Sequence, residues 1–306
     1  MRMVPCTLVA IALTLMGCSS ATKVASGERS KQQSVVIEPE ELAQTLASGA
    51  RPMLLDARKL EDYGPAHALG AQRIDIHEWT DASRDGAGLN DTEAWSIRIG
   101  ALGIDGNSPV IVYDDGGMTS AARAWFILRE CGVRDVRVVN GGWSNLCPVL
   151  EPSLVQAGNP GEFEAVRFAA AAPTRVTTRD ELKQISAAHS KSIVDVRTAN
   201  EYTGNIQAQP GREARRTGHV PGATNLPHKQ LIDERGRLRS AEELRAMFAA
   251  SGASDGKPAV LYCQSGGRAA FAALAAEYAG LSETTVYYMS MGEWLGDPSC
   301  PISTSN

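Results

Sequence analysis

Short, almost continuously apolar runs recur along the chain, and segments of helical periodicity lie between them. Runs of this kind are typical of parallel strands that are buried on both faces. The expected strands lie at 52–58, 110–114, 136–139, 192–197, 259–262 and 285–288. The expected helices are Glu38–Ala47, Thr92–Ile99, Ala121–Glu130, Thr178–Ala188, Ser240–Ala250 and Ala269–Tyr278. Because strands and helices alternate, we predict an α/β protein whose small parallel sheets are flanked by helices on both faces.

The second half of the chain repeats the first. Four features occur in both halves in the same order: a strand ending in Asp-x-Arg (Asp56, Asp195), a His-containing turn (His67, His219), a strand that precedes a helix (110–113, 259–262) and a glycine beside or near a tryptophan (Trp143, Trp294). Such ordered self-similarity indicates a duplicated domain. We expect the first copy at 35–150, a connection rich in Pro, Gly and Ala at 151–175, and the second copy at 176–306.

The segment after the strand at 259–262 carries the main chemical signal. Its residues are Cys263, Gln264, Ser265, Gly266, Gly267 and Arg268. A glycine-containing turn before a helix can direct several backbone N–H groups towards one anion. These N–H groups and the positive helix end stabilise negative charge on a sulfur atom. We therefore predict that Cys263 is a nucleophile rather than an inert buried thiol.

This loop resembles the active loop of rhodanese-type sulfurtransferases, in which a cysteine opens a six-residue turn between a strand and a helix. The order of motifs is similar to that of tandem-domain rhodaneses, which combine a degenerate N-terminal copy with a catalytic C-terminal copy. The resemblance covers almost the whole chain after its N-terminal leader. It implies two tandem rhodanese-like domains.

The first copy is predicted to be inactive. Asp114 stands where the second copy has its loop cysteine, and a carboxylate cannot carry a sulfane sulfur. We expect this copy to close one side of the active cleft, whereas Asp114 and Asp115 are only weak evidence for a metal site. Asp195, Arg197 and His219 all have counterparts in the inactive copy, so we assign them structural roles.

The resemblance implies a double displacement through a Cys263 persulfide. The thiolate attacks the outer sulfur of thiosulfate, releases sulfite and passes the sulfur to cyanide or a thiol. No metal or organic cofactor is required. The expected substrate-binding residues, whose amides would hold the terminal sulfur, are Gln264, Ser265, Gly266, Gly267 and Arg268.

One departure from mammalian members of the family concerns the donor site. They carry an arginine six residues after the Asp that ends the first strand of the catalytic copy, whereas this chain has Glu201 there. Arg268 is therefore the expected partner of the anionic donor. Arg212, Arg215 and Arg216, in a long insertion, are the alternative cations.

Three other functions remain open. The loop of 3-mercaptopyruvate sulfurtransferases resembles Cys-Gly-Ser-Gly-Val-Thr, from which Gln264, Gly267 and Arg268 depart, so thiosulfate is favoured. Dual-specificity phosphatases of this fold have one more residue between Cys and Arg than the four here, and a smaller ring fits a sulfur atom. The third alternative is a non-catalytic binding protein at the membrane that carries a persulfide.

The N-terminal segment resembles the leader of bacterial lipoproteins. Arg2 precedes an apolar run, Val4–Met16, that is too short to span a membrane. The run leads into Gly17-Cys18, which is similar to a lipobox. The resemblance implies a signal peptide at 1–17, lipidation of Cys18 and a tether at 18–34. Ser19 then implies the outer membrane, facing the periplasm, while an ordinary secretory signal is the alternative.

Composition limits the partners. With 306 residues and 43% hydrophobic content, the chain can bury two domain cores, and a net charge of −5 argues against nucleic acid. We expect a monomer that binds a small anionic donor and a thiol or cyanide acceptor. An exported location permits disulfides, of which Cys131, Cys147 and Cys300 can form at most one.

Overall fold

The computed structural model describes residues 34–159, 161, 163–206, 216–281 and 283–304. Residues 34–306 belong to one compact unit. The predicted signal peptide, the lipidation site Cys18, and Arg212 and Arg215 of the insertion lie outside the described residues.

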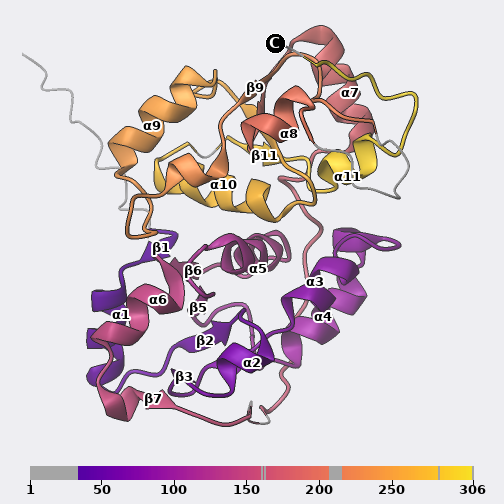
Figure 1. The fold of residues 1–306 in the computed structure, drawn as a ribbon. Coiled ribbons are helices and arrows are strands. Elements are labelled where there is room, and N and C mark those ends of the chain that lie inside the picture. Colours follow the sequence, from indigo (N-terminus) through magenta and orange to yellow (C-terminus); the bar gives the residue numbers. More distant parts are fainter. Residues whose placement is uncertain (1–33, 160, 162, 207–215, 282, 305–306) are drawn as a thin grey trace, which may run out of the picture. The chain divides into compact units, whose positions relative to one another are not determined.

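The first module is a parallel sheet covered by helices (Figure 1). Its strands are β1 (Val36–Ile37), β2 (Met53–Asp56), β3 (His67–Ala68), β4 (Gln72–Arg73), β5 (Val110–Tyr113), β6 (Val136–Val139) and β7 (Val155–Gln156). Its helices are α1 (Pro39–Ala47), α2 (Leu60–Tyr63), α3 (Ile76–Ala82), α4 (Thr92–Gly100), α5 (Thr119–Glu130) and α6 (Gly142–Leu146), with short 3-10 turns at Gly88–Asn90, Cys147–Val149 and Pro152–Leu154. The sheet has the parallel order β1-β6-β5-β2-β4.

The second module has the same architecture. Its strands are β8 (Ser192–Asp195), β9 (Ala223–Asn225), β10 (Ala259–Tyr262) and β11 (Thr285–Val286). Its helices are α7 (Arg179–Ala188), α8 (Ala199–Thr203), α9 (Ala241–Ala250), α10 (Gly267–Tyr278) and α11 (Ser290–Trp294), with a 3-10 turn at His228–Leu231. The parallel order is β11-β10-β8-β9, so the predicted α/β class and the repeated sheet are confirmed.

The two modules agree in strand register. Asp56 at the end of β2 pairs with Tyr113 of β5, and Asp195 at the end of β8 pairs with Tyr262 of β10. The residue after each of these tyrosines is Asp114 in the first module and Cys263 in the second. The backbone therefore places these two side chains at corresponding positions, at the carboxyl ends of the central strands of the two sheets.

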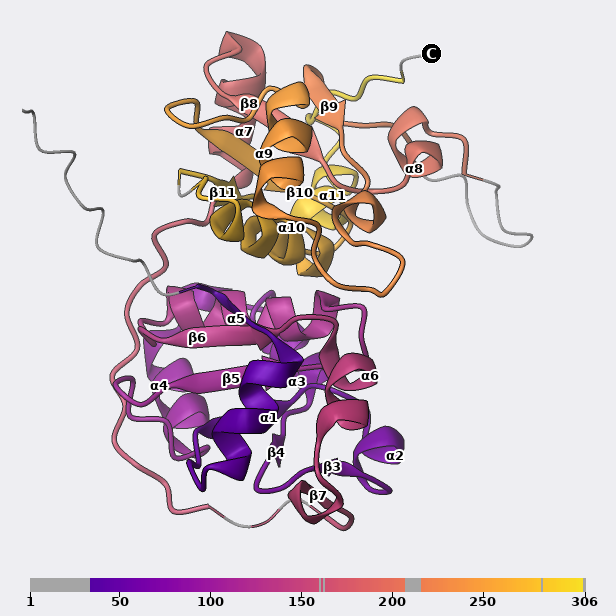
Figure 2. The same ribbon diagram turned by 90° about the vertical axis from the view of Figure 1, so that its left-hand side faces the viewer.

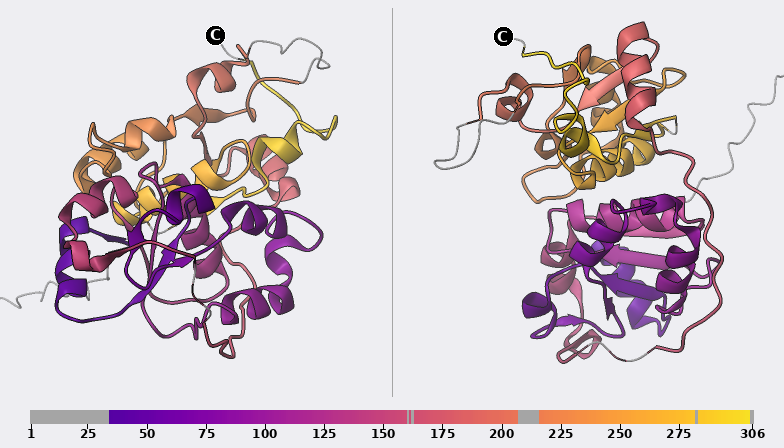
Figure 3. Two further views of the ribbon diagram at one scale, coloured as in Figure 1. Left: turned by 60° about the horizontal axis from the view of Figure 1, so that its bottom comes forward. Right: turned by 90° about the vertical axis from the view of Figure 1, so that its right-hand side faces the viewer.

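Weaker pairings are duplicated as well. The antiparallel pair of β3 with β7, in which His67 faces Gln156, has a counterpart in the bridge between His219 and Ser303. The predicted connection at 151–175 thus includes β7, which pairs with β3 of the first module. Residues 163–175 run along that module towards α7 (Figure 3). On the way, the Val166 N–H donates to the Gly100 carbonyl.

The Asp-x-Arg motifs are buried ion pairs that hold loops. Arg197 Nη2 lies 2.6 Å from Asp195 Oδ2 and donates to the Gly218 carbonyl at 2.8 Å, and Arg58 binds Asp56 with the same geometry. His219 Nδ1 lies 2.8 Å from the Tyr202 carbonyl, and its ring stacks on that tyrosine. The structural roles predicted for these residues are confirmed.

Helix ends follow local sequence signals. Ser240 and Glu243 form a capping box at the start of α9. Gly280 follows the end of α10 with φ +85°, a conformation that glycine adopts without a steric penalty.

Helices α5 and α10 pack against each other between the two sheets (Figure 2). Nearly every residue of both helices is buried, and α10 is rich in alanine, whose small side chain permits close approach on all sides. A single apolar cluster includes residues of both helices and both modules. The start of α10, where the cysteine loop ends, therefore lies against the first module. In the described part of the chain, no helix is long and apolar enough to cross a membrane.

Candidate active site

Cys263 lies between the end of β10 and the start of α10. Its N–H donates to Ser290 Oγ at 3.1 Å, and its Sγ accepts the Gly266 N–H at 3.1 Å. The Ser290 hydroxyl donates to the Tyr287 carbonyl at 2.8 Å and lies 3.9 Å from Sγ. Cys263 is only 1% exposed. The loop and the turn before α11 therefore fix the sulfur atom in a narrow, polar surrounding.

The two loop glycines are required by close contacts. Gly266 has φ +95°, and a Cβ there would lie 2.7 Å from the Tyr288 carbonyl oxygen. A Cβ on Gly267 would lie 2.8 Å from Arg123 Nη2. Any other residue at either position would have to displace a neighbour, so the pair of glycines allows the loop to approach both modules.

The corresponding loop of the first module shows what this backbone shape can bind. The Asp114 carboxylate accepts the N–H groups of Gly116, Met118, Ser120 and Ala121 at 3.0–3.2 Å. Burial raises the pKa of Asp114 to about 6, although these N–H donors oppose the rise. A pocket lined by N–H donors is suited to an anion and unsuited to a metal ion.

The Cys263 loop has no carboxylate in this place. Among the described residues, the N–H groups of Gln264, Ser265, Gly267, Arg268 and Ala269 have no hydrogen-bond partner. The loop therefore presents backbone donors that can stabilise a second negative atom next to Sγ.

A cleft of about 320 Å³ adjoins the loop, and residues of both modules line it. It is lined by Ile76, His77 and Thr80 of α3, by Thr119, Ser120 and Arg123 of α5, and by Ser265, Gly267 and Arg268. Within the described chain this lining contains two guanidinium groups and several hydroxyls but no carboxylate. Such a lining suits a small anion.

The structure distributes the predicted loop residues unequally. Ser265, Gly267 and Arg268 line the cleft. Gly266 is buried, and Gln264 is not among the residues that line the cleft. Arg268 is bound by Glu201: its Nη1 and Nη2 donate to the two carboxylate oxygens at 2.7 and 2.8 Å. Arg216 of the insertion donates instead to the backbone carbonyls of Asp297 and Cys300.

Arg123 was not singled out by the sequence, yet it contacts the loop directly. Its Nη2 donates to the Ser265 carbonyl at 2.9 Å and its Nη1 to the Tyr288 hydroxyl at 3.0 Å. The Tyr288 hydroxyl also lies 2.9 Å from Ser83 Oγ. Arg123 lies on α5, a largely apolar helix of the first module. A charged residue within such a helix is the sequence signal that could have identified Arg123 as a candidate site residue.

The other described cysteines lie outside the cysteine loop. Cys131, Cys147 and Cys300 are free thiols, so the described structure contains no disulfide among them. Burial, together with the Glu130 charge, raises the pKa of Cys131 to about 12. Burial and the nearby Asp297 also raise the pKa of Cys300. These two thiols are therefore poor nucleophiles near neutral pH.

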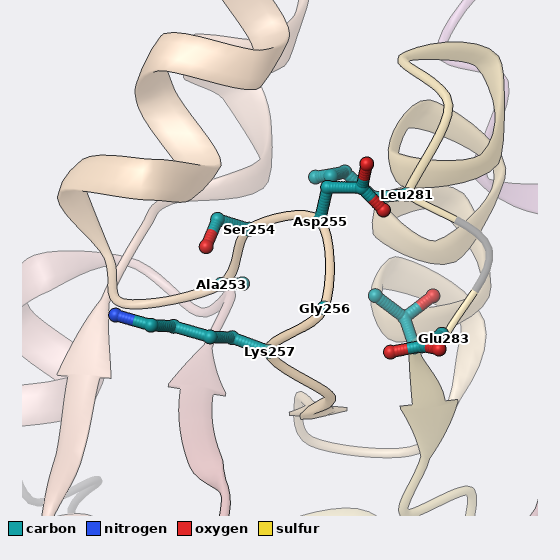
Figure 4. A pocket seen from close by; sticks show the side chains of 8 residues that line it. Ala253, Ser254, Asp255, Gly256, Lys257, Leu281 and Glu283 are labelled. Carbon is teal, nitrogen blue, oxygen red and sulfur yellow. The ribbon is translucent and has the colours of Figure 1, made fainter.

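Other cavities of the described chain do not adjoin the loop in the same way. The cavity in Figure 4, lined by Ala253–Lys257, Leu281, Glu283 and Thr284, lies before β10 and β11, at the end of the sheet opposite to Cys263. Its volume of about 10 Å³ has room for little more than one water molecule. No group of three His, Cys, Asp or Glu side chains in the described residues could hold a metal ion.

These features define a class of protein: a duplicated parallel α/β module with a cysteine loop at a helix N-terminus in the second copy only. The family model described as the rhodanese-like domain matches residues 38–147 and 178–297. The chain therefore belongs to the rhodanese-like family, in the tandem-domain form that the sequence resembled.

Relatives with both modules are sulfurtransferases. The 3-mercaptopyruvate sulfurtransferase of Escherichia coli is 32% identical over 257 residues, covering 83% of this chain and 89% of the relative. The thiosulfate sulfurtransferase of Gallus gallus is 32% identical over 251 residues, covering 81% and 84%. The crystal structure of SseA from Escherichia coli, described as a 3-mercaptopyruvate sulfotransferase, gives a TM-score of 0.71 at 28% identity and covers 84% of this chain and 98% of that one. The chain is thus a rhodanese-type sulfurtransferase by family, and these equal identities leave the donor open.

Proposed function

We propose that the protein transfers sulfane sulfur from thiosulfate to a thiol or cyanide through a persulfide on Cys263. The observation that carries the proposal is the cysteine loop, which lies at a helix N-terminus beside a cleft without carboxylates. A thiolate, a donor dianion and a persulfide all bring negative charge to this place, where backbone N–H groups and the positive helix end can stabilise it.

The first half-reaction breaks the S–S bond of thiosulfate. The Cys263 thiolate attacks the outer sulfur, sulfite leaves with the bonding electron pair, and Cys263 keeps the sulfur as a persulfide anion. The loop N–H groups without a protein partner stabilise the terminal sulfur. A nucleophilic acceptor then removes that sulfur and restores the thiolate.

Thiosulfate is favoured over 3-mercaptopyruvate because two guanidinium groups and several hydroxyls line the cleft. A sulfonate has three oxygens in a tetrahedral arrangement and can accept from several such donors, whereas a carboxylate has two in a plane. 3-Mercaptopyruvate is the second candidate, supported by the equally similar Escherichia coli relative.

A parallel assay of the purified protein separates these functions. We expect turnover with thiosulfate and cyanide to exceed turnover with 3-mercaptopyruvate, and no release of phosphate from an aryl phosphate. Preference for 3-mercaptopyruvate would reverse the donor assignment. A Cys263 that accepts sulfur only from another protein would indicate a persulfide-carrying binding protein instead.

A further inference from the structure

The contact between Arg268 and Glu201 joins the cysteine loop to α8. Two hydrogen bonds of 2.7 and 2.8 Å connect the two terminal nitrogens of the guanidinium with the two carboxylate oxygens. The side chains are only 23% and 20% exposed. A bidentate pair of this geometry fixes the plane of the guanidinium as well as its distance.

Glu201 is itself held rigidly. Its Oε2 accepts the N–H and the hydroxyl of Thr198 at 3.1 and 2.9 Å, and Thr198 Oγ1 accepts the Glu201 N–H in return. This capping box starts α8 directly after Arg197, whose buried pair with Asp195 anchors the end of β8. The carboxylate therefore has a fixed position relative to the sheet that also carries Cys263.

Arg268 keeps hydrogen-bond donors for a ligand. A guanidinium has five N–H groups, and Glu201 uses two of them. Among the described residues no other side chain or carbonyl accepts from Arg268, and the residue lines the cleft. Its Nε–H edge is a second fork that matches two oxygens of an anion.

The charges near the pair determine what Glu201 contributes. Burial alone would raise the pKa of Glu201, but the hydrogen bonds from Arg268 and Thr198 outweigh it and lower that pKa to about 2. Glu201 is therefore an anion at neutral pH and cancels the charge of Arg268. His228 also faces this region, and burial together with Arg268 lowers its pKa, so it adds no cation. Glu201 can thus assist anion binding only by orienting Arg268.

We propose that Glu201 is a positioning residue that orients Arg268, so that the free edge of the guanidinium contacts the anionic end of the sulfur donor. This inference rests on the proposed function, because it takes the donor to be an anion in the cleft. The two residues of this ion pair have different roles: Arg268 touches the donor, and Glu201 acts through Arg268.

The test compares Glu201→Gln, Arg268→Ala and the double variant in the full protein. Glutamine preserves a capping box but offers only one acceptor oxygen to the guanidinium. Glu181→Gln is the matched control, because Glu181 forms the same capping box with Thr178 at the start of α7. Glu201→Asp serves as a second variant that retains the charge but shortens the reach.

We expect Glu201→Gln to lower kcat/KM for thiosulfate by about tenfold, chiefly through KM, and Glu181→Gln to leave it unchanged. In the Arg268→Ala background, Glu201→Gln should cause no further loss, because its effect passes through Arg268. Glu201→Asp should fall between wild type and Glu201→Gln.

An unchanged or increased kcat/KM in Glu201→Gln would overturn the proposal, since removing an anion that merely repels the donor would increase it. A full additional loss in the Arg268→Ala background would also overturn it. If the wild type uses 3-mercaptopyruvate but not thiosulfate, the proposed donor is wrong, and the same comparison with that donor still tests the role of Glu201.

Discussion

At the scale of single residues, Arg123 of the first module contacts the cysteine loop of the second module. It is 7% exposed, and its guanidinium lies 5.5 Å from the centroid of the Tyr288 ring as well as donating to the loop. A buried charge is costly unless hydrogen bonds satisfy it, and here the Ser265 carbonyl and the Tyr288 hydroxyl do so. Arg123 thereby connects the cysteine loop with Tyr288, which lies in the turn before α11.

Arg123→Ala should therefore disturb the loop and its support together. We expect a loss of about 1–3 kcal/mol in the free energy of unfolding, because the buried Tyr288 hydroxyl and the partly buried Ser265 carbonyl lose their donor. We also expect a decrease of about tenfold or more in kcat/KM for thiosulfate. Urea denaturation and steady-state kinetics measure both, with Arg129→Ala on the same helix as the control. Equal effects of the two substitutions on kcat/KM would contradict this role for Arg123.

The Glu201 carboxylate gives a pH dependence with a definite sign. Its pKa in the folded protein, about 2, lies below the ordinary value of 4.5, so its contribution to stability is present above pH 4.5 and is lost as the pH falls towards 2. Wild type should be more stable than Glu201→Gln at pH 7, and the difference should shrink below pH 4.5. Thermal unfolding at several pH values tests this, and a difference that grows with acid would contradict it.

At the scale of elements, the two strand-loop-helix units have one backbone plan and different occupants. In the first module, the Asp114 carboxylate accepts the N–H groups at the start of α5. In the second module, Cys263 lies before the start of α10, and several loop N–H groups have no described hydrogen-bond partner. The same physical feature, a cluster of N–H groups, is structural in one copy and available for chemistry in the other.

Asp114→Asn should destabilise the protein without abolishing the fold. The amide nitrogen would face N–H donors that now bind a carboxylate oxygen, and we expect a cost of about 1–3 kcal/mol in the free energy of unfolding. Asp115→Asn is the control, since Asp115 is exposed and accepts a single N–H at 3.2 Å. Urea denaturation of both variants gives the comparison. A smaller cost for Asp114→Asn than for Asp115→Asn would refute this account of the first loop.

Elements with a strong local pattern could be predicted from the sequence, and those held by distant contacts could not. The strands at 110–113 and 259–262 are apolar throughout, and the Ser240–Glu243 signal marks α9 by itself. Thr198 and Glu201 carry the same signal, but the contact of Glu201 with Arg268 joins residues that are 67 positions apart. Likewise, β7 is a two-residue strand fixed by its partner β3, and no periodicity can mark so short an element.

At the scale of the whole molecule, the modules share an apolar core across α5 and α10, and residues of both modules line the cleft beside the cysteine loop. This contact gives the first module, which lacks the cysteine, a structural role, because Gly267 of the loop approaches Arg123 of the first module closely. We also propose that the chain is tethered to the outer membrane of a bacterium through lipid on Cys18, as the resemblance of the leader implies.

The tether makes a separate prediction. Cys18→Ala should abolish incorporation of a fatty-acid probe in a bacterial host, whereas Cys6→Ala, a cysteine within the same leader, should not. Fractionation of the labelled cells would then show whether the protein follows the outer membrane. Release of unlipidated wild-type protein would instead indicate an ordinary secretory signal.

The central claim is that Cys263 carries the transferred sulfur, and mass spectrometry of its peptide after incubation with thiosulfate tests it most directly. The account predicts a mass increase of about 32 Da on the Cys263 peptide, its removal by cyanide, and its absence in a stably folded Cys263→Ser variant. The added sulfur on Cys131, Cys147 or Cys300, with an unmodified Cys263 and turnover intact, would contradict the account.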